Sequence, residues 1–109
     1  MTEQIDIFKC LDFIRDHAAQ YAQAKANRVY CEEYRKTLKS QLIKRHVDSP
    51  VTAQEREAYA DESYKAHLEA LQAAVYEEER LRWLIEGAKL KVSVWQSLGA
   101  NQRAEAKSL

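Results

Sequence analysis

The stretch His46-Val-Asp-Ser-Pro-Val-Thr52 decides the fold of this chain, because it holds the only proline in the sequence. Both glycines, Gly87 and Gly99, lie in the last quarter of the chain. About 45 residues on either side of the stretch therefore carry almost nothing that stops a helix. A residue that precedes proline avoids the α-helical backbone region, so a first helix should end near Val47 or Asp48.

The apolar residues on both sides of this break recur every three or four positions, which is the period of one buried helical stripe. In the first segment the stripe comprises Leu11, Ile14, Ala18, Tyr21, Cys31, Tyr34, Leu38 and Leu42. In the second segment it comprises Tyr64, Leu68, Leu71, Val75, Leu81, Ile85, Ala88, Val92 and Trp95. We predict a helix over residues 5–47, a turn over 48–52 and a second helix over 53–98.

Local signals set the ends of the second helix. Thr52-Ala-Gln-Glu55 fits a capping box, in which the threonine and glutamate side chains each bind an orphan backbone amide. Gly99 follows Leu98 and fits a C-terminal cap, and the polar residues 99–109 should form a frayed tail. The whole chain, 1–109, is then one small helical domain.

Charge placement predicts how the two helices pair. In both helices acidic residues come early and basic residues come late, so an antiparallel arrangement sets opposite charges side by side. We expect Lys44 and Arg45 to approach Glu55 and Glu57, and Lys39 to approach Asp61 and Glu62. The predicted fold class is all-α, a long antiparallel two-helix hairpin that resembles a coiled coil.

The second helix carries a surplus apolar face between Trp83 and Leu98, and the start of the first helix is also apolar beyond one stripe. One partner helix cannot cover two faces, so we predict a homo-oligomer that forms a helical bundle. The interface residues expected from the pattern are Phe8, Leu11, Trp83, Gly87, Leu90, Val94 and Leu98.

Sites of chemistry are not evident in the sequence. His17, His46 and His67 are isolated, so we expect no metal site and no cofactor. Glu77-Glu-Glu79 has the composition of a solvated acidic run, and no Gly-rich phosphate loop or nucleophile motif occurs. We expect a protein that is not an enzyme.

Composition points to a soluble protein of the cytoplasm. The 109 residues carry a formal net charge of zero, which argues against general electrostatic binding to nucleic acid or to a membrane. No run approaches the roughly 20 apolar residues of a membrane span, and the start lacks a signal-peptide pattern. Cys10 and Cys31 are too far apart on one helix to form a disulfide, as suits free thiols in a reducing compartment.

The segment 88–104, Ala-Lys-Leu-Lys-Val-Ser-Val-Trp-Gln-Ser-Leu-Gly-Ala-Asn-Gln-Arg-Ala, resembles the C-terminal signature of small helical phage and prophage proteins. The Val-Trp pair and the Ala-Asn-x-Arg ending carry the resemblance, and the helical layout is similar to that of phage recombination mediators. The resemblance implies oligomers that help load a recombinase on single-stranded DNA. By position it implies nucleic-acid contacts at Lys89, Lys91, Trp95 and Arg103.

Three hypotheses for function follow. The first is a non-catalytic phage accessory protein that aids DNA recombination or replication in the host cytoplasm, through assembly and contact with single-stranded DNA or its binding proteins. The second is a protein-binding module that inhibits a host defence or replication factor, and the third is a structural coiled-coil spacer. The basic run 35–45 fits either nucleic-acid contact or ion pairs between the helices.

Overall fold

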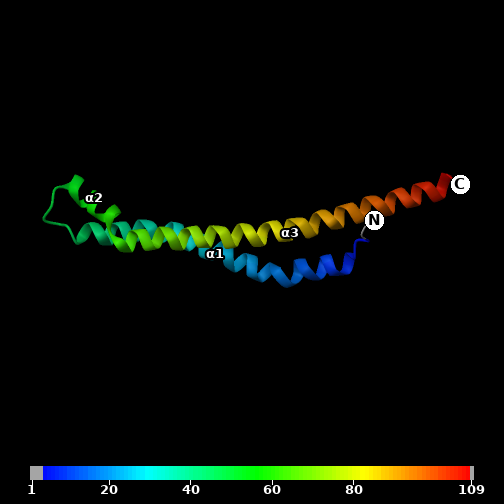
Figure 1. Cartoon of the computed structure of the whole chain (residues 1–109), viewed down its shortest axis with the longest axis horizontal. Coiled ribbons are helices and arrows are strands. Elements are labelled where there is room, and N and C mark those ends of the chain that lie inside the picture. The colour runs from blue at the N-terminus through cyan, green and yellow to red at the C-terminus, as the bar shows by residue number, and fades with distance from the viewer. Residues whose placement is uncertain (1–3, 109) are drawn as a thin grey trace. The chain divides into compact units, whose positions relative to one another are not determined.

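The computed structural model describes residues 4–108, and these are almost entirely α-helical (Figure 1). Helix α1 spans Ile7–Lys44, α2 spans Val51–Ala60 and α3 spans Glu62–Ser108. None of the described residues forms a β-strand. The predicted all-helical class is confirmed, with three helices in place of the expected two.

The contacts within the chain group into two compact units, and α1 and α3 contribute to both. The terminal unit comprises Met1–Tyr21 and Arg80–Leu109, and the central unit comprises Ala22–Glu79. The terminal unit holds the start of α1 and the C-terminal part of α3. The central unit holds the end of α1, all of α2 and the start of α3.

Helix α2 begins one residue after the proline, so the expected capping box at Thr52 and Glu55 is wrong. The N-cap is Pro50, with φ −55° and ψ 152° and no side-chain cap, and its carbonyl accepts a bond of 2.9 Å from the Gln54 amide. Thr52 therefore lies inside the helix. The Gln54 side chain instead donates from Nε2 to the carbonyl of Ser49, 2.8 Å away, which joins α2 to the preceding turn.

Asp61 divides the helix that was expected over 53–98 into α2 and α3. Its backbone is extended, with φ −65° and ψ 140°, so neither helix can pass through it. Its carboxylate accepts a bond of 2.8 Å from the Ser63 amide, and its carbonyl accepts from the Tyr64 amide at 3.1 Å. This is the geometry of an aspartate N-cap. The bond from the Ser63 amide lowers the pKa of the Asp61 carboxyl.

Helix α3 does not end at Gly99 but continues to Ser108. A glycine cap requires a left-handed backbone, and no described residue has a positive φ. Residues 100–108 include three alanines and a glutamine, arginine, glutamate and lysine, all good helix formers that propagate the helix. Leu109, the last residue of the expected tail, lies outside the described residues.

The core of the central unit is small and sits where α2 meets the other two helices. Leu42 is fully buried, and Leu38, Ala58 and Tyr64 pack with it. Within this unit α1 and α3 are antiparallel, because Arg28 contacts Glu78 while Cys31, further along α1, contacts His67.

Candidate functional site

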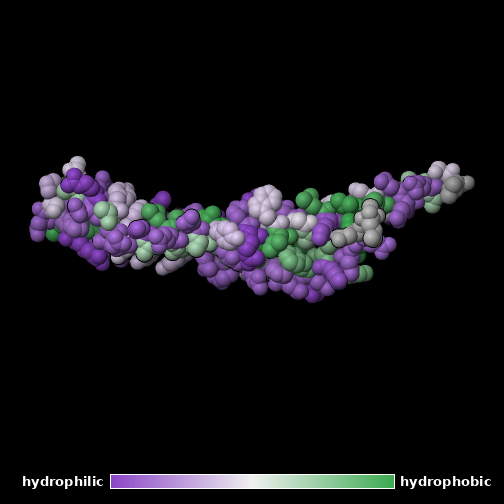
Figure 2. Space-filling view, in the orientation of Figure 1, coloured by the Kyte–Doolittle hydropathy of each residue, from purple (hydrophilic) through white to green (hydrophobic). Residues whose placement is uncertain are grey.

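Large apolar side chains gather on the surface of the terminal unit. Leu90 is 64% exposed and Trp83 is 62% exposed, although both stand on a well-formed helix. Figure 2 shows a group of hydrophobic residues on the visible face over the start of α1 and the yellow and orange part of α3. We call the exposed large apolar side chains of the terminal unit the apolar surface; they are Phe8 and Leu11 on α1, and Trp83, Leu84, Leu90, Val94, Trp95 and Leu98 on α3. Exposed apolar clusters of this kind mark interaction sites.

Helical spacing explains the apolar surface. Leu81 and Ala88 are buried and hold α3 within the terminal unit. Trp83, Leu90 and Val94 stand on a different face of the same helix, at successive spacings of seven and four residues, so they cannot reach that core. Of the residues predicted for the oligomer interface, all are solvent-exposed except Gly87, which is half-buried. That a second copy covers them stays a prediction.

A pocket of about 380 Å³ adjoins the apolar surface. Its volume is at the lower end of the range that binds ligands or large side chains. The pocket is lined by Lys9, Cys10, Phe13, Trp83, Leu84, Gly87, Ala88 and Lys91. Leu84 and Phe13 were not predicted as site residues, because the pocket depends on how α1 and α3 pack within this unit and not on the pattern of one helix.

Gly87 lies at this pocket and leaves space that none of residues 4–108 fills. A Cβ atom built on Gly87 meets no atom within 4 Å. Glycine in a helix interior costs about 0.5–1 kcal/mol relative to alanine. No close approach among the described residues accounts for that cost, so the space beside Gly87 is open to atoms from outside the chain.

The four residues predicted to bind nucleic acid do not form one patch. The Lys89 ammonium pairs with Glu86 of its own helix at 3.1 Å, whereas Lys91 lines the pocket. Residues two apart on a helix do not share a face, but Lys91 and Trp95, four apart, do. Trp95 is 45% exposed, so it is not a core residue. The Arg103 side chain lies against Gly99.

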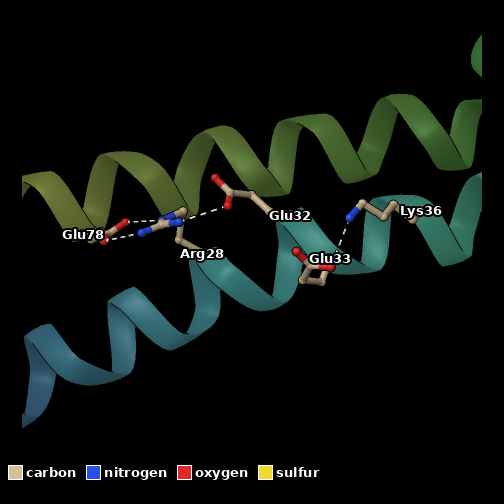
Figure 3. Close-up of polar contacts among 5 residues, drawn as sticks. All are labelled: Arg28, Glu32, Glu33, Lys36 and Glu78. Atoms are coloured by element: carbon tan, nitrogen blue, oxygen red, sulfur yellow. Dashed lines mark hydrogen bonds and ion pairs between the residues drawn. The ribbon is translucent and has the colours of Figure 1, made fainter.

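A buried ion pair stabilises the central unit (Figure 3). Glu78 is 6% exposed and accepts two hydrogen bonds from Arg28, from Nε at 2.6 Å and from Nη2 at 3.0 Å. Arg28 also donates to Glu32 at 3.0 Å. These bonds, first to Glu78 and then to Glu32, raise the pKa of the Arg28 guanidinium. The prediction of a solvated run at 77–79 is therefore wrong for Glu78, which faces α1.

The basic run at the end of α1 pairs with acidic residues around α2, but not with the expected ones. Lys39 lies 3.9 Å from Glu55, and Arg45 lies 3.8 Å from Asp61. The prediction had these partners exchanged, because it treated α2 and α3 as one straight helix. A hydrogen bond with the Tyr59 side chain, helped by the charge of Glu55, raises the pKa of the Lys39 ammonium. These contacts favour ion pairing over nucleic-acid contact for this run.

The histidines and acidic residues of the described part of the chain do not form a metal site. The His17 Nδ1 lies 2.8 Å from the Phe13 carbonyl, and the His67 Nε2 lies 2.6 Å from the Cys31 carbonyl, so each ring binds backbone. No group of three or more His, Cys, Asp or Glu residues stands close enough to hold a metal ion, as far as residues 4–108 show. Nor does any helix over these residues combine the length and apolar character that a membrane crossing needs.

Comparison with models of protein families, with curated proteins and with solved structures finds no match to this chain.

Proposed function

We propose that the protein is a non-catalytic accessory protein that acts by assembling with copies of itself. Its α1 and α3 form one long antiparallel hairpin, and hairpins associate through the apolar surface into a helical bundle. The observation that carries the proposal is the exposure of Trp83, Leu90 and Val94, between 50% and 64%, on one face of α3. Removing such a face from water stabilises association by about 25 cal/mol per Å² of apolar area.

Phage DNA recombination or replication, in the cytoplasm of the host, is the setting that we propose for this assembly. The support is the resemblance of residues 88–104 to small phage and prophage proteins. Trp95 is 45% exposed on α3, where an aromatic ring suits a stacked base. One subunit offers few such contacts, but an oligomer multiplies them by avidity.

The same apolar surface favours a second candidate, a module that binds a host defence or replication protein. Exposed aromatic residues such as Trp83 and Phe8 are typical anchors of protein interfaces. A structural spacer would need neither exposed tryptophan, so the exposure of Trp83 and Trp95 disfavours it.

An affinity pull-down from lysogenic or infected cells separates the two candidates. We expect recombination or single-strand-binding proteins to be recovered without nuclease and largely lost with it. Recovery of one host protein, unchanged by nuclease, would replace the first candidate with the second. The control is Leu90→Glu, which places a charge in the apolar surface and should lose partners in either case.

A further inference from the structure

The pocket of the terminal unit carries two positive charges that no described residue balances. Lys9 and Lys91 both line it, and neither makes an ion pair with any described residue. Lys89, two residues away, does have an acidic partner in its own helix. An apolar pocket flanked by two ammonium groups that have no acidic partner among the described residues suits an occupant that carries both a large apolar side chain and a carboxylate.

The outer face of α1 has this combination. Phe8 is 73% exposed, more than any other large apolar side chain among the described residues. Asp12 follows it by four residues, so the two stand on one face of the helix. Asp12 pairs with Arg15 at 3.3 Å, but both side chains are more than half exposed, so this pair is weak and can be exchanged.

We propose that the pocket is a docking site for α1 of a second copy, whose Phe8 enters it over Gly87 and whose Asp12 pairs with Lys91. The inference rests on the assembly proposed above and adds the residues that make the contact. Phe8 and Asp12 stand on the outer face of α1, whereas the pocket opens between α1 and α3, so the contact joins two different surfaces and each copy has one phenylalanine to give and one pocket to receive it. The open space at Gly87 then has a use, since a Cβ atom there would take up room that the phenylalanine ring needs.

The alternative pairing of two α3 helices is disfavoured by charge. An antiparallel pair centred on Leu90 would bring Lys91 of each copy close to Lys89 of the other, and the nearby carboxylate of Glu86 already pairs with Lys89. Docking of α1 instead sets Asp12 of one copy beside Lys91 of the other. Like charges that meet at an interface weaken it, and opposite charges fix its register.

Charge reversal with mixing tests the contact directly. Lys91→Glu and Asp12→Lys should each raise the dimer Kd about tenfold, because each sets like charges against one another at the contact. An equimolar mixture of the two variants should associate nearly as tightly as the wild type. Each contact between the two different variants holds either the native ion pair or the same pair with its charges reversed, and neither arrangement repels. Lys89→Glu is the matched control and should leave Kd close to the wild-type value. Sedimentation equilibrium gives Kd, and circular dichroism checks that each variant keeps its helicity.

Truncation of the phenylalanine supplies an independent arm. Phe8→Ala should raise Kd about 30-fold or more, as for a buried anchor, whereas Tyr76→Ala, which removes a 69% exposed ring from the central unit, should not. A wild-type oligomer that Leu90→Glu dissociates, but whose Kd is unchanged by Phe8→Ala and not restored by mixing, would overturn the docking while leaving the proposed assembly intact. A wild-type chain that stays monomeric would overturn both.

Discussion

Leu42→Ala should destabilise the protein more than any other single truncation in the central unit. Leu42 is 0% exposed and packs against Leu38, Ala58 and Tyr64, so it touches all three helices. Loss of a fully buried leucine costs about 2–5 kcal/mol, the sum of lost burial and of the cavity left behind. Domains have about 5–15 kcal/mol of total stability, so we expect a large drop in the urea midpoint with an unchanged m-value.

Leu68→Ala is the matched control for this change. The sequence pattern placed Leu68 in the same buried stripe, but the structure leaves it 42% exposed. Its truncation should cost about 1 kcal/mol or less, because much of the side chain already contacts water. Equal losses for the two variants would refute the assignment of the core to the α1–α2–α3 junction, and would favour a straight hairpin in which both leucines are buried.

Three further changes test other parts of the structure. Glu78→Ala should lower the free energy of unfolding several times more than Glu32→Ala, since the two carboxylates are 8% and 46% exposed; equal effects in urea titrations would contradict a buried pair. The Asp61 carboxyl has a pKa below its ordinary value of 3.8, so its contribution is fully present above that pH and is lost as the pH falls through the lowered pKa. Asp61→Asn should remove this part of the acid dependence of stability while keeping the cap, and an unchanged profile would refute it. In a Trp83→Phe background, a single-stranded oligonucleotide should quench the fluorescence of Trp95, and the quenching should fall steeply as the salt concentration rises. No quenching at low salt would contradict the proposed DNA contact.

The helical class and the break near Pro50 follow from the sequence because both depend on local signals. Proline and the three- to four-residue apolar period act within a few residues of each other. The second break was missed although Asp61-Glu62 has the form of an N-cap followed by an acidic first turn. Apolar periodicity continues through this point, and the pattern alone does not show a change in helix direction.

The candidate site was predictable where it depends on one helix and not where it depends on two. The spacing of Trp83, Leu90 and Val94 placed them together, and they are exposed on α3. The pocket needs the packing of Lys9 and Phe13 against α3, which no single-helix pattern contains. The burial of Glu78 likewise depends on Arg28, 50 residues away.

The mass of the protein in solution tests the central proposal most directly. Sedimentation equilibrium should show the wild type as a dimer or larger at micromolar concentration, because the apolar surface is otherwise left in water. Leu90→Glu should be a monomer of 12.7 kDa with its helicity retained. A wild type that stays monomeric up to about 100 μM, far above the Kd of a specific dimer, would contradict assembly as the basis of its function.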